Sequence, residues 1–240
     1  MCIGIKGVTD PTLSDLVKRM EWIEFGRIGD LFDILSKSGV RYAVLAGSVP
    51  KQRFYKKELN LDKTTTDFLD RLKDKRDRTL LYGLILKLKF SLGIKVLKSS
   101  LFMEEFIPRK GILTERPPTE REWNDIAFGR KIARKIAGLD IGQAILVKDK
   151  TVIAIEALEG TNETIKRARQ LAGENLVMIK MARPRQDSRF DMPTIGFETV
   201  HIASESDVKV IAMEAYKTLF IERERALKLA NDNNISIVAI

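Results

Sequence analysis

The chain has 240 residues and a formal net charge of +9 at pH 7, with 44% hydrophobic and 31% charged residues. This balance is typical of a globular protein rather than a disordered one, and the length suffices for two domains of ordinary size. A single cysteine and a single histidine exclude an internal disulfide and a zinc site built from cysteine and histidine. The chemistry must therefore come from carboxylates, hydroxyls and cations.

The sequence has no run of eighteen or more apolar residues, and its N-terminus lacks the basic and hydrophobic regions of a secretion signal. We therefore expect a cytoplasmic protein. The positive charge favours anionic partners, namely phosphate-bearing metabolites, acidic lipid surfaces or nucleic acid. Nucleic acid ranks last, and we expect none as a partner, because the cations are scattered and no nucleic-acid-binding motif accompanies them.

Short apolar runs alternate with amphipathic segments over the first hundred residues, which predicts an α/β fold. The expected strands are 2–5, 20–25, 40–47 and 94–97, and the expected helices are 13–19, 28–37 and 80–92. Residues 51–78 are predicted to be exposed loop with a helical turn. We interpret residues 1–115 as an N-terminal Rossmann-like domain with a parallel sheet. Since the chain begins inside a strand, we expect the first βα unit to be missing.

The second half follows a proline-marked connection, residues 111–119, which we interpret as the junction between domains. Thr119 and Glu122 form a predicted capping box for a helix to residue 137. A hairpin is expected over 144–157, and further helices and strands follow: helices 162–171, 198–203 and 223–230, and strands 175–182, 208–212, 218–221 and 235–240. We predict a C-terminal α/β catalytic domain of mixed sheet over residues 116–240.

The charged loop, residues 183–196, follows the strand predicted for residues 175–182, and α/β proteins usually bind ligands at the carboxyl ends of strands. It contains two carboxylates, Asp187 and Asp191, together with the guanidinium groups of Arg183, Arg185 and Arg189. The carboxylates can hold Mg²⁺ or divide metal binding and water activation between them, while the arginines neutralise phosphate oxygens. The alternative is a surface lattice of ion pairs without function.

Two further positions are candidate phosphate contacts. Gly160 and Thr161 enter a predicted helix, whose free N–H groups and dipole attract anions, although Thr161 or Asn162 could simply cap that helix. Lys180 precedes the charged loop and either points into the same site or is solvated. Gln143 and Gly47 are weaker signals, because turns need small or polar residues whatever they bind.

Taken together, these segments resemble the UDP-2,3-diacylglucosamine pyrophosphatases of the LpxI type, the metal-dependent hydrolases of lipid A biosynthesis. The resemblance runs through nearly the whole chain, in residues 46–51, 111–114, 125–129, 139–143, 154–161, 184–196 and 235–240. It implies hydrolysis of UDP-2,3-diacylglucosamine to 2,3-diacylglucosamine 1-phosphate (lipid X) and UMP, with Mg²⁺ or a similar ion, in a site between two domains. By the same resemblance, we expect about thirty residues of the family's usual opening to be missing, the length of roughly one βα unit.

The resemblance implies that the essential aspartate lies within residues 186–191, as either Asp187 or Asp191, and we choose Asp187 first. The expected substrate contacts are Gln186, Arg185, Arg189, Thr194, Gly160, Thr161, Lys180, Gln143 and Gly47. Two motifs depart from the family pattern. The family's Gly-Thr-Asp corresponds to residues 160–162, where Asn162 replaces the aspartate, and the second residue of an acidic pair is replaced by Arg78, after Asp77. Peripheral contact with the inner membrane surface and a homodimer are further hypotheses. The alternative function is a non-catalytic module that binds a nucleotide sugar or a lipid phosphate.

Overall fold

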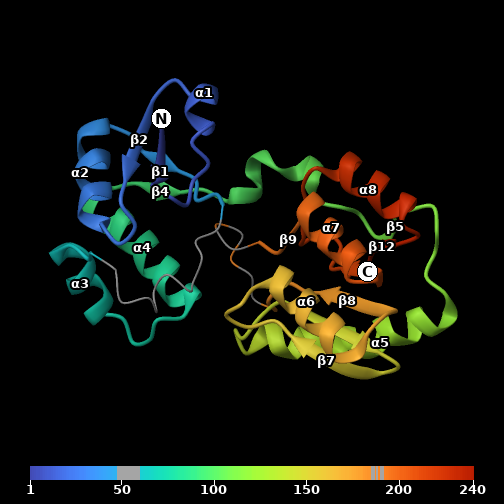
Figure 1. Cartoon of the computed structure of the whole chain (residues 1–240). Helices are drawn as coiled ribbons and strands as arrows, with labels where there is room; N and C mark the ends of the chain where they lie inside the picture. Colours follow the sequence, from blue (N-terminus) through green and yellow to red (C-terminus); the bar gives the residue numbers. More distant parts are fainter. Residues whose placement is uncertain (48–59, 185–186, 188, 190–191) are drawn as a thin grey trace. The chain divides into compact units, whose positions relative to one another are not determined.

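The computed structural model describes residues 1–47, 60–184, 187, 189 and 192–240 (Figure 1). These residues form two compact units, Met1–Ser99 and Ser100–Ile240. In the described parts of the chain, no helix combines the length and the apolarity that crossing a membrane requires.

Within residues 1–47 and 60–99, the first unit has two separate pairs of parallel strands. Strand β1 (Cys2–Ile5) pairs with β2 (Met20–Ile23), and β3 (Tyr42–Ala43) pairs with β4 (Lys95–Val96). The run predicted as strand 40–47 forms only the short β3, and Tyr42 is 62% exposed, whereas a strand inside a doubly covered sheet is buried. A Rossmann-like sheet is therefore not confirmed among the described residues of this unit.

The described residues of this unit also form the helices α1 (Leu13–Leu16), α2 (Ile28–Ser38), α3 (Lys63–Asp70) and α4 (Asp77–Leu92). As predicted, α2 and α4 end at glycines, Gly39 and Gly93, which both have a φ of 68° in the left-handed region. Helix α3 is longer than the helical turn expected there. It begins because the Asp62 carboxylate accepts a hydrogen bond from the N–H of Thr65 at 2.6 Å, which caps the helix.

The second unit is built on a six-stranded sheet in the order β5-β12-β10-β8-β6-β7. Its strands are β5 (Gly111–Ile112), β6 (Ala144–Lys148), β7 (Thr151–Ile155), β8 (Leu176–Lys180), β10 (Val208–Met213) and β12 (Ser236–Ala239). Strands β8, β10 and β12 run parallel, whereas β5, β6 and β7 pair antiparallel with their neighbours. This confirms the predicted mixed sheet. The connection predicted over 111–119 begins as its edge strand β5. A separate parallel pair joins β9 (Thr194–Ile195) to β11 (Leu219–Phe220).

Helices cover both faces of this sheet (Figure 1). Side chains alternate along β6 and β8, so Ile145 and Ile179 pack on the α5 side (Glu120–Gly138) while Leu146 and Met178 pack on the other. That second face carries α6 (Thr161–Ala172), α7 (Phe197–Glu205) and α8 (Arg223–Asp232). Two short 3₁₀ helices, Ser99–Phe102 and Glu104–Phe106, precede β5.

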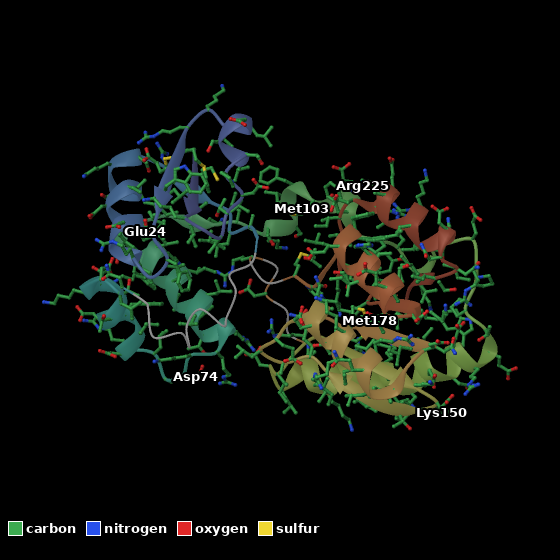
Figure 2. The ribbon with its side chains drawn as sticks, viewed as in Figure 1. Glu24, Asp74, Met103, Lys150, Met178 and Arg225 are labelled. Carbon is green, nitrogen blue, oxygen red and sulfur yellow. The ribbon has the colours of Figure 1, made fainter. Side chains whose placement is uncertain are left out.

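The hairpin β6–β7 is fastened to α5 by a buried carboxylate. Asp125 is 4% exposed and accepts hydrogen bonds from the N–H groups of Asp149 at 3.0 Å and Lys150 at 2.6 Å. Figure 2 shows Lys150 at this turn. The predicted capping box of α5 is confirmed, since the N–H groups of Thr119 and Glu122 donate to each other's side chains. The hydrogen bonds of Asp125 thus hold the turn of the hairpin to α5, at the end of the sheet opposite the charged loop.

Candidate active site

One edge of the second unit's sheet gathers the candidate residues. Strand β8 ends at Lys180, which pairs with Ala144 at the start of β6 and with Met213 at the end of β10. Strand β7 also ends here, because Ile155 pairs with Ile145. The charged loop follows β8 after Met181 and Ala182. We call this the carboxyl edge, and its position is the one at which α/β sheets usually bind ligands.

Lys180 is buried at this edge, with 7% of its surface exposed. Its Nζ atom donates hydrogen bonds to the Thr161 Oγ1 atom at 2.9 Å and to the Thr194 carbonyl oxygen at 2.9 Å. The solvated alternative for this lysine is therefore wrong. Burial lowers the pKa of Lys180, and the negative charge of Glu156 opposes that shift.

Glu156 completes this arrangement, although it was not among the predicted site residues. Its Oε1 atom accepts the hydroxyl hydrogen of Thr161 at 2.8 Å, and its Oε2 atom accepts the N–H groups of Gln143 at 3.0 Å and Ala144 at 2.8 Å. The signal was present in the sequence, because Glu156 directly follows an apolar strand, as the charged loop does. We call the chain of hydrogen bonds through Glu156, Thr161 and Lys180 the relay.

Helix α6 begins beside the relay. Gly160 occupies the N-cap position with a φ of 84° and without a side-chain cap, so capping by Thr161 or Asn162 is not what the structure shows. A side chain at Gly160 would meet no atom within 4 Å, but its φ lies in the left-handed region that favours glycine. The Thr161 hydroxyl is thereby left to join the relay.

Gln143 takes part through its backbone. Its carbonyl oxygen accepts the N–H of Met181 at 2.8 Å, and its own N–H donates to Glu156. The side chain is 9% exposed, and its Oε1 atom is buried without a hydrogen-bond partner among the described residues. Alternation along β6 places this side chain with Ile145, on the face opposite Lys180. The structure thus joins the backbone of Gln143, rather than its amide group, to the relay.

The described part of the charged loop contains a compact ion pair. The Arg189 guanidinium donates to the Asp187 carboxylate through Nε at 2.9 Å and Nη2 at 2.6 Å, and the N–H of Arg189 donates to the same carboxylate at 3.0 Å. Arg183, at the start of the loop, forms a half-buried ion pair with Asp140 at 2.6 Å. Asp140 follows α5, so this pair ties the beginning of the loop to that helix.

The other predicted contacts fall into two groups. Arg185, Gln186 and Asp191 lie outside the described residues, and Gly47 belongs to the first unit. Across the residues that the structure describes, no group of three or more histidine, cysteine, aspartate or glutamate side chains could hold a metal ion. Of the predicted substrate contacts, the structure brings together Lys180, Thr161 and Thr194, and Gly160 is next to Thr161 in the chain.

A buried carboxylate, that of Glu214, lies beside the relay. Glu214 follows β10, is 4% exposed, and accepts hydrogen bonds from Arg134 at 2.9 Å, Lys217 at 2.8 Å and the N–H of Ala182 at 3.0 Å. Burial raises the pKa of Glu214, but these hydrogen bonds outweigh it and leave the pKa below its ordinary value. Glu214 thus holds the chain immediately before the charged loop.

This shift predicts a dependence of stability on pH. The pKa of Glu214 is lower in the folded protein than its ordinary value of 4.5. The ionised carboxylate therefore stabilises the protein at pH values above 4.5, and this contribution is lost as the pH falls through the folded-state pKa. We expect Glu214→Gln to reduce the free energy of unfolding at neutral pH, and the gap from the wild type to narrow between about pH 5 and pH 3. Urea unfolding of both proteins across this range measures the gap. If the difference in unfolding free energy stays constant across this pH range, ionisation of Glu214 is not its cause.

Comparison with known proteins shows the family of this chain. The model of the LpxI N-terminal domain matches residues 1–106, and the model of the LpxI C-terminal domain matches residues 109–238. The chain is also similar to a Caulobacter vibrioides protein named UDP-2,3-diacylglucosamine pyrophosphatase LpxI. The two are 29% identical over 229 residues, which cover 91% of this chain and 81% of that relative. Since the two family models together cover nearly all of the sequence, the chain belongs to the LpxI family.

Proposed function

We propose that this protein hydrolyses the pyrophosphate bond of UDP-2,3-diacylglucosamine to 2,3-diacylglucosamine 1-phosphate and UMP, in lipid A biosynthesis. The observation that carries the proposal is membership of the LpxI family across both halves of the chain. The name of the Caulobacter vibrioides relative supports the same substrate. The carboxyl edge supports a phosphate-directed reaction, because it combines a buried lysine, a hydroxyl and a loop of carboxylates and guanidinium groups.

We assign the chemical roles to the charged loop and to the relay. Asp187 and Asp191 would position the metal ion and the attacking water, and Asp187 is the first choice for the essential carboxylate. Arg185 and Arg189 neutralise the diphosphate, while Gln186 and Thr194 contact the substrate from the same loop. Lys180 and the start of α6, at Gly160 and Thr161, add positive potential at the carboxyl edge.

The available donors suit magnesium better than zinc. Mg²⁺ takes oxygen ligands, commonly one or two protein carboxylates together with water and substrate phosphates, so a cluster of three side chains is not required. Asp187 supplies such a carboxylate, which Arg189 orients, and Asp191 would supply the second. A bound Mg²⁺ would offset the charge on the diphosphate and polarise it towards attack.

We also infer that the enzyme works in the cytoplasm and contacts the inner membrane surface, because the proposed substrate carries two acyl chains. The net charge of +9 supports attraction to anionic lipid headgroups, to which each lysine or arginine near the surface adds about 1 kcal/mol. Such contact would be weakened by salt, since exposed charges are screened over about 10 Å at an ionic strength of 0.1 M.

Removal of divalent ions tests the proposal. We expect a chelator to reduce UMP release from UDP-2,3-diacylglucosamine by at least about 10²-fold, and added Mg²⁺ to restore it, because the ion offsets the charge of the diphosphate. Liquid chromatography with mass spectrometry measures UMP and the sugar phosphate together. Full turnover in the chelator would remove the metal from the proposal, and failure to form either product with Mg²⁺ present would overturn the hydrolysis itself.

A further inference from the structure

The relay has a fixed direction of hydrogen bonding. The backbone N–H groups of residues 143 and 144 donate to Glu156, and Thr161 donates its only hydroxyl hydrogen to the same carboxylate. The Thr161 oxygen is then an acceptor, and it receives a hydrogen from the Lys180 ammonium. Each polar group along the relay has a complementary partner, which favours a single arrangement of the buried network.

The far end of the relay holds the charged loop. Lys180 is the last residue of β8, separated from the charged loop by Met181 and Ala182, and its Nζ atom also binds the carbonyl oxygen of Thr194, the first residue of β9. One side chain therefore ties the end of β8 to the later part of the loop that carries Asp187 and Asp191. Loss of the Lys180 orientation would release the loop at Thr194, while Glu214 and the pair between Arg183 and Asp140 still hold its start.

We propose that Glu156 is a positioning residue, which orients Lys180 through Thr161 and thereby holds the charged loop at Thr194. This role rests on the proposed hydrolysis, since the loop carries the carboxylates assigned to it. Glu156 acts at a distance from the reacting atoms, through two side chains, and it binds two backbone N–H groups at the start of β6 as well.

The isosteric variant Glu156→Gln tests the direction of the relay. If the glutamine oxygen keeps the two backbone N–H groups, its NH₂ group faces Thr161, whose oxygen must then accept a hydrogen bond from it. The Thr161 hydroxyl hydrogen would lose its carboxylate acceptor, and the negative charge that supports Lys180 would be gone. We expect kcat to fall by about 10²-fold with KM within about threefold, because misplacement of catalytic groups by about 1 Å costs this much.

Asp125→Asn is the matched control. Asp125 is a carboxylate that also accepts two backbone N–H groups, but it lies on α5 and binds the turn of the same hairpin, at the end opposite Glu156. We expect both variants to lower the midpoint of thermal unfolding and only Glu156→Gln to lower kcat. An equal fall of kcat in the two variants, or a kcat for Glu156→Gln within about twofold of the wild type, would overturn the positioning role.

A double-mutant cycle separates the relay from two independent contacts. Thr161→Ala removes the middle of the relay, so the double variant with Glu156→Gln should lose little more kcat than either single variant. Losses that multiply would overturn the proposal. Should Glu156→Gln fail to fold, Thr161→Ala alone carries the test, since it leaves the backbone contacts of Glu156 in place and should still lower kcat rather than raise KM.

A readout without turnover keeps the inference apart from the proposed function. In the full chain labelled with ¹⁵N-lysine, the Lys180 Nζ signal reports the pKa of this group directly. Glu156 is the charged group that raises the pKa of Lys180 against burial, so the Glu156→Gln variant should shift the titration to lower pH. An unchanged titration overturns the relay even if the wild type hydrolyses the substrate. A lowered pKa supports the relay even if the wild type releases no UMP.

Discussion

Asp187→Asn is expected to reduce turnover of UDP-2,3-diacylglucosamine by on the order of 10³-fold, the range seen when a carboxylate that acts on water or metal is neutralised. The variant keeps the shape of the side chain but removes the charge that the Arg189 guanidinium binds. The assay is UMP release with saturating Mg²⁺. Asp191→Asn, assayed alongside, decides which of the two aspartates is essential, because the larger loss identifies it.

The control for this prediction is Asp149→Asn. Asp149 also pairs with an arginine, Arg121, but it lies in the hairpin turn at the opposite end of the sheet, so its loss should leave turnover within about twofold of the wild type. If Asp187→Asn and Asp191→Asn both retain wild-type turnover, the charged loop does not perform the chemistry.

Gly142→Ala is expected to lower the free energy of unfolding by about 3 kcal/mol, which corresponds to a decrease of roughly 10 °C in the unfolding midpoint. A Cβ atom at this position would lie 2.0 Å from the carbonyl oxygen of Glu156 and 2.7 Å from its carbonyl carbon. Both are backbone atoms, so no side-chain rotation relieves the clash. The chain at Glu156 must move, and the relay moves with it.

Gly138→Ala is the matched control in the same stretch of chain. Its Cβ atom would meet Pro184 at 3.5 Å, an ordinary van der Waals contact, and the residue lies at the end of α5, where alanine is favoured by up to about 1 kcal/mol. Thermal unfolding should therefore separate the two variants clearly. Equal midpoints would mean that the close approach of Gly142 to Glu156 carries no energetic weight.

Much of the second unit could be predicted from the sequence because its signals are local. The Thr119 capping box and the hairpin around residues 148–151 depend on residues a few positions apart, and the structure contains both. The first unit gave weaker signals. The apolar run at 40–47 looks like a strand in isolation, but pairing and burial decide its length, and only Tyr42 and Ala43 pair.

The site was predictable only in part for a similar reason. The charged loop is conspicuous because its charges are contiguous, whereas Glu156 and Glu214 look like single acidic residues after apolar runs. Their roles arise from contacts across the chain, such as the one between Arg134 and Glu214, which are 80 positions apart. Thr161 was expected as a phosphate contact or a helix cap; the structure shows that its hydroxyl links Glu156 to Lys180 rather than capping α6, and the phosphate contact stays a prediction.

The most direct test of the central claim is hydrolysis of UDP-2,3-diacylglucosamine in H₂¹⁸O by the full chain with Mg²⁺, followed by mass spectrometry of the products. The account predicts UMP and 2,3-diacylglucosamine 1-phosphate in equal amounts, with one ¹⁸O atom in the phosphate of one product, since water attacks one phosphorus. Binding of the intact substrate without formation of labelled product would contradict the account and would favour a non-catalytic module that binds a nucleotide sugar or a lipid phosphate.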